Sequence, residues 1–195
     1  ANGSGILTLD KAGRPHIGYY NNDDDPNMYS LKYAILIDNN WQIQTLEQGT
    51  GTVSDVSLAL DSFDSPHMVY VMNVPSARET YLKYGHWKGN VWDAQIVDQK
   101  DSDVYYPLVP IRLALDSADQ LHILYFRAVQ GAMHIAHYLY ASLVDSLWNI
   151  QTIAQGYNGY GALALDEANH PHLCYSSTDG EIYAYWTGSS WSRQK

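Results

Sequence analysis

One pattern occurs four times along the chain and limits what the chain can fold into. Each copy has leucines three residues and one residue before an aspartate, a histidine six residues after it and a tyrosine nine residues after it. The aspartates are separated by 51, 55 and 50 residues, a period that indicates an array of small, similar units. The aspartate–histidine pairs are Asp10 and His16, Asp61 and His67, Asp116 and His122, and Asp166 and His172.

Each repeat is predicted to form four short strands, A to D. Alternating apolar residues on both sides of the aspartate indicate strands A and B, and a tyrosine-rich segment indicates strand C. Strand D begins at a tryptophan that is followed three residues later by a glutamine: Trp41 and Gln44, Trp92 and Gln95, Trp148 and Gln151, Trp191 and Gln194. No segment shows sustained helical spacing, so the fold is predicted to be all-β.

The connection between strands A and B is predicted to be a tight turn. Three residues after each aspartate stands a residue type that tolerates a left-handed backbone: Gly13, Asp64, Asp119 and Asn169. We expect the aspartate and histidine to face each other across this hairpin and to form a side-chain hydrogen bond. Metal binding and catalysis are the alternatives, but four copies cannot all face one substrate. Cys174, the single cysteine, lies in a repeated apolar strand and is expected in the core.

The repeated unit, as in "LALDSFDSPHMVY", resembles the β-propeller repeats of many exported bacterial proteins that are often described as sialidase-like. Its Asp-x-x-Gly turn is also similar to that of NHL-type propeller repeats. The resemblance covers residues 5 to 195 and implies one β-propeller domain, 1–195, of four-stranded antiparallel blades. The blades are expected at about 3–51, 52–103, 104–156 and 157–195. Four blades would close a small ring, or form an arc that another chain completes.

This resemblance is specific for architecture and weak for function, because propellers carry lectins, hydrolases, lyases and scaffolds. No repeat carries the full Ser-x-Asp-x-Gly-x-x-Trp box of sialidases, and the chain has only five arginines from which to build their three-arginine clamp.

The loops that differ between repeats are the B–C and D–A loops, which alternating strand direction brings to one rim. Variable loops on a regular frame are where binding residues usually lie. Tyrosine offers a flat apolar face and a hydroxyl group, which suit sugar rings. The candidate ligand-binding residues are Tyr105, Tyr106, Tyr157, Tyr160, Asp101, Asp103 and Arg78. The alternative is that these tyrosines only cover the ends of the blades.

One acidic segment is a candidate metal site. Asp23 and Asp25 lie in the densest acidic cluster and could bind Ca²⁺, but the spacing lacks the alternation and the glycine of an EF-hand. A solvated acidic turn is the alternative. No cofactor is expected, apart from this possible calcium.

Charge and hydropathy argue against nucleic acid as a partner and against a membrane-spanning segment. The formal charge of −10 argues against nucleic acid, because affinity for phosphate backbones needs clustered cations. No apolar run approaches 18 residues, so no membrane span is expected. The propeller resemblance implies an extracellular or periplasmic location.

Three functions remain open. The first is a non-catalytic, lectin-like module that binds a glycan or a protein partner through the variable loops. The second is a polysaccharide hydrolase or lyase, whose carboxylates would come from residues such as Asp101, Asp103 and Glu79, with Arg78 beside them. The third is a structural or assembly subunit that contacts another protein or forms a homo-oligomer.

Overall fold

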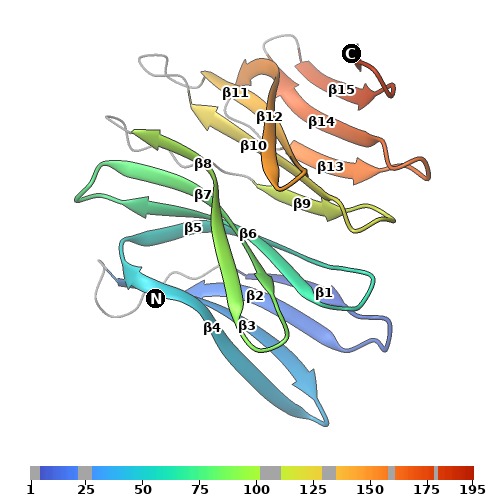
Figure 1. Cartoon of the computed structure of the whole chain (residues 1–195). Helices are drawn as coiled ribbons and strands as arrows, with labels where there is room; N and C mark the ends of the chain where they lie inside the picture. The colour runs from blue at the N-terminus through green and yellow to red at the C-terminus, as the bar shows by residue number, and fades with distance from the viewer. Residues whose placement is uncertain (1–4, 22–27, 102–110, 129–134, 158–160, 178–179) are drawn as a thin grey trace. The chain divides into compact units, whose positions relative to one another are not determined.

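The computed structural model describes residues 5–21, 28–101, 111–128, 135–157, 161–177 and 180–195. These residues form sixteen strands, arranged in four antiparallel sheets of four strands each (Figure 1). Within each sheet the strands are hydrogen-bonded in chain order, which is the topology of propeller blades. The all-β prediction and the four-stranded antiparallel blades are confirmed.

Each repeat supplies one sheet, named here blades 1 to 4. Blade 1 contains β1 (Gly5–Leu9), β2 (Pro15–Asn21), β3 (Met28–Ile37) and β4 (Asn40–Thr50). Blade 2 contains β5 (Thr52–Leu60), β6 (Pro66–Val74), β7 (Glu79–Trp87) and β8 (Trp92–Asp101). Blade 3 contains β9 (Arg112–Leu115), β10 (Leu121–Ala128), β11 (Ile135–Val144) and β12 (Leu147–Tyr157). Blade 4 contains β13 (Gly161–Leu165), β14 (Pro171–Ser177), β15 (Gly180–Trp186) and β16 (Trp191–Gln194).

The chain forms two compact units, Ala1–Tyr105 and Tyr106–Lys195. Unit 1 contains blades 1 and 2, and unit 2 contains blades 3 and 4, so each unit holds one complete contact between two blades. In the part of the chain that the structure describes, no helix has the length and apolar character needed to cross a membrane.

The turn between the first two strands of each blade has the predicted left-handed residue. The φ angles of Gly13, Asp64, Asp119 and Asn169 are 76°, 61°, 59° and 65°. In blade 2 the Oδ1 atom of Asp61 accepts the backbone N–H groups of Phe63 at 2.8 Å and Ser65 at 2.7 Å. The repeated aspartate therefore closes the turn by satisfying backbone donors that the short loop leaves unpaired.

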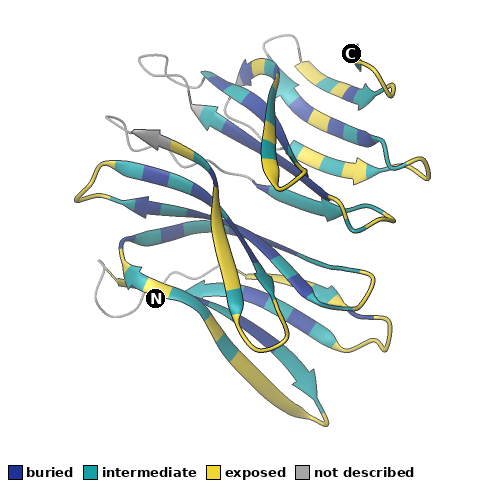
Figure 2. Cartoon of the chain, in the orientation of Figure 1, coloured by how far each residue is buried: buried dark blue, intermediate teal, exposed yellow. Residues whose placement is uncertain are grey.

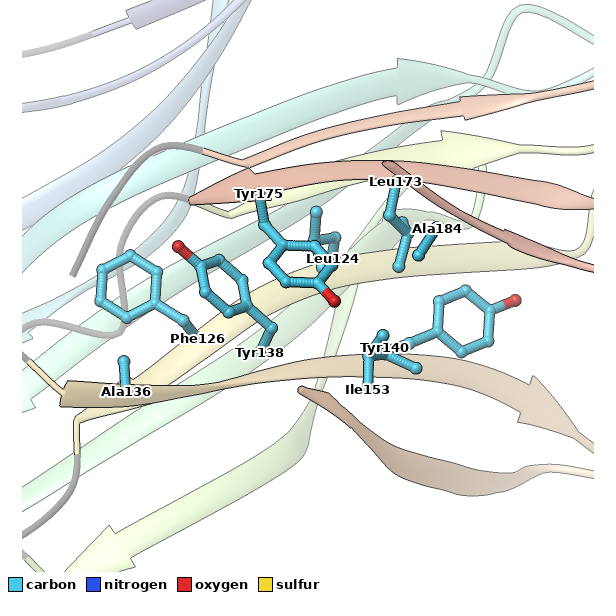
Figure 3. Packing of buried hydrophobic residues seen from close by; sticks show 9 residues of the cluster. All are labelled: Leu124, Phe126, Ala136, Tyr138, Tyr140, Ile153, Leu173, Tyr175 and Ala184. Carbon is cyan, nitrogen blue, oxygen red and sulfur yellow. The ribbon is translucent and has the colours of Figure 1, made fainter. Parts of the chain in front are cut away.

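Each unit has its core between its two blades. In unit 2 the cluster consists of Leu124, Phe126, Ala136, Tyr138, Tyr140, Ile153, Leu173, Tyr175 and Ala184 (Figure 3). In unit 1 it consists of Tyr29, Leu31, Tyr33, Val53, Val56, Leu58, Met68 and Tyr70. The hydroxyl groups of the core tyrosines reach polar partners, as Tyr33 reaches His16 and Tyr70 reaches Glu47.

Burial differs between strands. The strands β3, β6 and β7 consist almost entirely of buried and half-buried residues, whereas much of β4 is exposed (Figure 2). The prediction for Cys174 was wrong, since its side chain is exposed. It alternates along β14 with Leu173 and Tyr175, which face blade 3, so it lies on the opposite face of blade 4.

Candidate functional site

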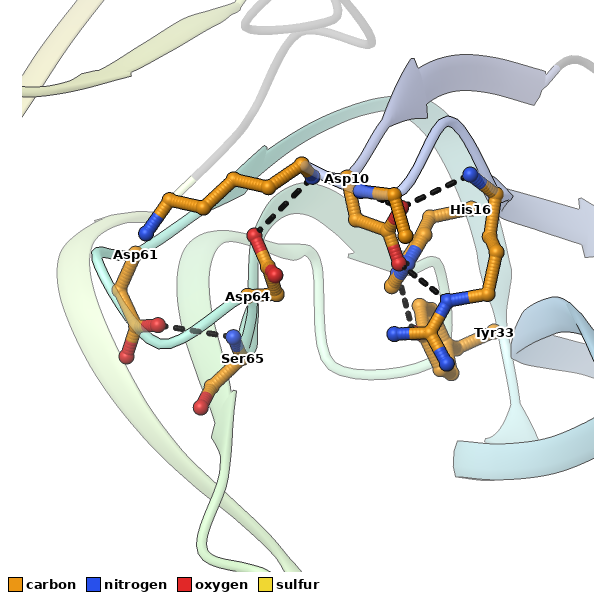
Figure 4. Close-up of polar contacts among 9 residues, drawn as sticks. Asp10, His16, Tyr33, Asp61, Asp64 and Ser65 are labelled. Carbon is orange, nitrogen blue, oxygen red and sulfur yellow. Dashed lines mark hydrogen bonds and ion pairs between the residues drawn. The ribbon is translucent and has the colours of Figure 1, made fainter.

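In each repeat the aspartate, the histidine and a tyrosine form a row of three neighbouring side chains, which we call the Asp–His–Tyr chain. In blade 1 the Oδ2 atom of Asp10 lies 3.3 Å from Nε2 of His16 (Figure 4). The other ring nitrogen, Nδ1, lies 2.5 Å from the hydroxyl group of Tyr33 on β3. Since a carboxylate only accepts hydrogen bonds, this arrangement is satisfied when Nε2 carries the proton and the tyrosine donates to Nδ1.

The Asp–His–Tyr chain also occurs in the other three blades. The His67 ring lies 3.4 Å from Asp61 and 2.7 Å from the Tyr84 hydroxyl group. The His172 ring lies 3.3 Å from Asp166 and 2.6 Å from Tyr183. In blade 3 the distance from His122 to Tyr140 is 2.6 Å, and Nε2 is 3.6 Å from the Asp116 carboxylate. The tyrosine was missed in the sequence, although it recurs in every predicted third strand.

Burial and hydrogen bonding shift the pKa values of the side chains in the Asp–His–Tyr chains. Burial alone would raise the pKa of Asp61, but hydrogen bonds from Ser65, Phe63 and His67 outweigh it and lower the pKa. Burial lowers the pKa of His122, and Asp116 only partly opposes this effect. Burial also raises the pKa of Tyr140 to about 12, which keeps its hydroxyl group protonated. A carboxylate, an imidazole and a phenol that satisfy one another's hydrogen-bonding groups in this way favour an architectural role.

Metal ligation has little support among the described residues. They contain no group of three or more histidine, cysteine, aspartate or glutamate side chains placed to hold a metal ion. In the His16 copy both ring nitrogens already face protein partners.

In each unit the tryptophan of the second blade forms a hydrogen bond and an aromatic contact with the first blade. In unit 1 the Trp92 indole N–H donates to Oε1 of Gln44 at 3.1 Å, and its ring contacts Tyr33 edge-on with 5.5 Å between centroids. In unit 2 Trp191 donates to Gln151, also at 3.1 Å, and meets Tyr140 edge-on at 5.3 Å. The repeated tryptophan and glutamine thus hold neighbouring blades in register.

A pocket of about 260 Å³ lies between blades 3 and 4, at the end where the β13–β14 turn and the end of β15 meet. We call it the tryptophan pocket. It is lined by His122, Tyr140, Ser142, Gln151, Asn169, His170, Pro171 and Trp186. Amide, hydroxyl and imidazole groups thus stand around a partly exposed indole ring, without a charged aspartate, glutamate, lysine or arginine in the lining.

The walls of the tryptophan pocket are held from both blades. The Asn169 side chain donates to the hydroxyl group of Ser117 at 2.8 Å and accepts that residue's backbone N–H at 3.2 Å. The Trp186 ring packs edge-on against Trp191, with 5.7 Å between centroids. His170 faces the Asp166 carboxylate with its Nδ1 atom at 3.6 Å. A ring held by packing next to fixed polar groups is suited to a small ligand with hydroxyl groups.

The corresponding positions in unit 1 carry different chemistry. Trp87 stands where unit 2 has Trp186 and packs against Trp92 in a tilted arrangement, with 5.6 Å between ring centroids. However, Ser142, Asn169 and His170 are replaced there by Ile35, Asp64 and Ser65. Aligning the repeats residue by residue shows these differences in the sequence, but only the tertiary structure shows that the residues line one pocket.

A second pocket, of about 390 Å³, lies at the other end of the same two blades. We call it the arginine pocket. It is lined by Ala154, Gln155, Tyr175, Ser177, Ile182, Arg193, Gln194 and Lys195. Gln155 and Ser177 lie near the ends of β12 and β14, so this pocket is on the rim of the B–C and D–A loops.

Only part of the predicted ligand site falls on described residues. Arg78 is exposed in the β6–β7 turn, where its φ angle is 55°. Its neighbour Glu79 pairs with Asp101 at the end of β8, so the backbone brings Arg78 and Asp101 to the same end of blade 2. Tyr157 ends β12, but its side chain lies outside the described residues, as does that of Asp101. Also outside them are Tyr105, Tyr106, Tyr160, Asp103, Asp23 and Asp25.

Four antiparallel four-stranded blades define a protein of the β-propeller class. Similar folds are found in a bifunctional GH43-CE protein of Bacteroides eggerthii, at 9% identity and a TM-score of 0.56, and in a fructofuranosidase from Schwanniomyces occidentalis complexed with fructosylnystose, at 14% and 0.53. These matches cover 98% and 97% of this chain but only 25% and 44% of those chains.

A fucose lectin from Kordia zhangzhouensis, in complex with methyl-fucoside, matches at 15% identity and a TM-score of 0.48, over 76% of this chain and 97% of its own. No family model matches the sequence, and no curated protein matches it. The fold comparison therefore rests on the two larger proteins.

Proposed function

We propose that the protein is a non-catalytic, lectin-like propeller whose tryptophan pocket binds a neutral sugar. The lining of this pocket carries the proposal: Trp186 provides an apolar ring face, and Gln151, Ser142 and His170 provide hydrogen-bonding groups around it. Sugar rings have apolar faces and peripheral hydroxyl groups, which match this combination. The volume of about 260 Å³ suits one ring rather than a long chain.

The fold comparison supports carbohydrate as the first ligand class to test, because one similar protein is a fructofuranosidase complexed with fructosylnystose. The loop rim remains a proposed second binding surface, with Tyr105, Tyr106, Tyr157 and Tyr160 as its candidates. A single propeller domain, an extracellular or periplasmic location and a protein partner or homo-oligomer likewise stay predictions.

The test is a panel of neutral and acidic glycans, with and without calcium, in which both retention of the protein and released product are measured. Retention without product is expected. The Trp186→Ala variant should bind a retained neutral sugar roughly ten-fold more weakly, the effect of losing one aromatic contact. Trp87→Ala is the matched control, since it removes the corresponding indole from unit 1.

Two outcomes would contradict the proposal. Equal losses in Trp186→Ala and Trp87→Ala would show that the tryptophan pocket is not the site. Release of product would show an enzyme, and the carboxylates of the loop rim would then be the residues to substitute. Trp186→Phe, which keeps an aromatic face against Trp191, separates loss of stacking from loss of folding.

A further inference from the structure

Glu47 on β4 holds the two blades of unit 1 together by an ionic contact. Its carboxylate accepts a hydrogen bond from the hydroxyl group of Tyr70 and lies 2.5 Å from Nζ of Lys83. The side chains of Lys83 and Glu47 are only 14% and 24% exposed. Contacts to a charged carboxylate in such a setting are stronger than neutral hydrogen bonds.

Unit 2 has no carboxylate at the corresponding position. Glu47 lies six residues after Trp41, and the residue six after Trp148 is Ala154. By the same alignment of repeats, Ile182 takes the place of Lys83 and Tyr175 takes that of Tyr70. Ala154, Ile182 and Tyr175 all line the arginine pocket, so this pocket occupies the space that the ionic contact fills in unit 1.

The groups that would receive a carboxylate are nevertheless present in unit 2. Tyr175 is 1% exposed and lines the pocket, and burial raises the pKa of its hydroxyl group, which therefore stays a donor. Arg193 stands where blade 2 has Ala94, so it supplies a cation at a position that is uncharged in unit 1. Its guanidinium group lines the pocket and donates to the backbone oxygen of Ile153, which fixes its position.

We infer that the arginine pocket binds a carboxylate-bearing ligand, and that this carboxylate takes the place that Glu47 occupies in unit 1. Tyr175 and Arg193 would donate to it, as Tyr70 and Lys83 donate to Glu47. The planar guanidinium group presents several donors in the geometry of a carboxylate.

The rest of the pocket indicates which molecule would carry that group. A volume of about 390 Å³ exceeds that of a carboxylate alone, and Gln155, Ser177 and Gln194 add uncharged polar groups to the lining. The ligand class that fits is a small acidic sugar, such as a uronic acid. This site is separate from the tryptophan pocket, which lies at the other end of the blades.

The test compares three probes by isothermal titration calorimetry on the whole chain: methyl glucuronide, its uncharged methyl ester, and acetate. The glucuronide is expected to bind at least about ten-fold more tightly than the ester, because the ester lacks the charge that Arg193 receives. Equal affinities, or no binding of the glucuronide, would overturn the inference. Acetate that binds as tightly as the glucuronide would overturn the assignment to an acidic sugar.

Two variants locate the binding. Ala154→Glu gives unit 2 the carboxylate of unit 1 and is expected to abolish glucuronide binding while leaving Arg193 in place. Arg193→Gln is expected to remove the preference for the acid over the ester. Full glucuronide affinity in Ala154→Glu would overturn the inference, even if Arg193→Gln failed to fold through loss of its contact with Ile153.

The two pockets can be tested against each other. Trp186→Ala should weaken binding of neutral sugars and leave glucuronide binding unchanged. Ala154→Glu should do the reverse. Loss of glucuronide binding in Trp186→Ala would place the acid in the tryptophan pocket and overturn the inference, whereas failure of neutral sugars to bind would affect only the proposed function.

Discussion

The indole N–H of Trp191 donates a hydrogen bond to Oε1 of Gln151 on the neighbouring blade, with 3.1 Å between the two atoms. Trp92 and Gln44 make the same contact at the same distance in unit 1. The contact therefore joins the two blades of each unit in the same way. The contribution of this contact to the free energy of unfolding can be measured in either unit.

Replacing Trp191 by Phe should lower the free energy of unfolding by about 1–3 kcal/mol, because it removes the donor and leaves the partly buried Gln151 oxygen without it. Trp92→Phe should have a similar effect in unit 1. Urea unfolding followed by circular dichroism measures both. Phe63→Ala, at an aromatic residue that is 84% exposed, is the control and should change stability by less than about 0.5 kcal/mol. If both tryptophan variants lose as little unfolding free energy as the control, the contact between tryptophan and glutamine does not stabilise the protein.

The four Asp–His–Tyr chains should differ in strength with their burial. His16 and Asp10 are buried in blade 1, whereas the side chains of His172 and Asp166 are 28% and 38% exposed. His16→Ala should cost about 2–5 kcal/mol, because it leaves the buried Tyr33 hydroxyl group without its partner and removes one of the donors to the buried Asp10 carboxylate. His172→Ala should cost less than about 1.5 kcal/mol, since water can replace the ring there. Equal losses in thermal or urea unfolding would show that burial does not set the strength of these chains.

Gly51 is required by both backbone conformation and space. Its φ angle is 123°, and a Cβ atom there would lie 2.4 Å from the backbone oxygen of Asn73. Gly89 also has a positive φ angle, 83°, but a Cβ atom there would meet no atom within 4 Å. Gly51→Ala should therefore cost about 3 kcal/mol, and Gly89→Ala about 1 kcal/mol for the backbone alone. If the two variants unfold at the same denaturant concentration, the close approach to Asn73 has no energetic consequence.

The turn aspartates should make the protein sensitive to acid. The pKa values of Asp10, Asp61 and Asp166 are lowered in the folded state, where backbone N–H groups and histidines donate to the carboxylates. Their stabilisation is present above the unfolded value of about 3.9, and it is lost as the pH falls from there through the lowered pKa. Asp61→Asn should therefore destabilise the protein at pH 7, and its deficit should shrink towards pH 2. A deficit that stays constant over this range in urea unfolding would contradict the assignment.

The contact between Glu47 and Lys83 should stabilise unit 1 through both charge and hydrogen bonding. Glu47→Ala should cost about 3 kcal/mol, because it leaves a largely buried ammonium group without its carboxylate. Glu47→Gln keeps an oxygen acceptor for Tyr70 but removes the charge, so its loss should be intermediate. The two variants are compared by urea unfolding. If Glu47→Gln matches the wild type, the charge contributes nothing and the contact acts only as a hydrogen bond.

Local structure followed closely from the sequence. The left-handed residues Asp64 and Asn169 could be placed because tight turns depend on a few neighbouring residues. The facing of His67 and Asp61 followed from strand alternation and the short loop. The tyrosine that completes each chain was missed because it comes from the third strand, whose register with the second depends on a loop of variable length.

The sequence by itself determined the repeat, the all-β class, the four-stranded blades and the turn chemistry, because these depend on local spacing and on alternation along single strands. Only the tertiary structure decided how one blade packs on the next. It brought Trp186 and Gln151 into the lining of one pocket. It also showed that unit 2 has a pocket at Ala154, whereas the Glu47 side chain contacts Lys83 at the corresponding place in unit 1. Such contacts join residues about forty positions apart and depend on the fit of side-chain volumes across the interface, which local sequence pattern does not encode.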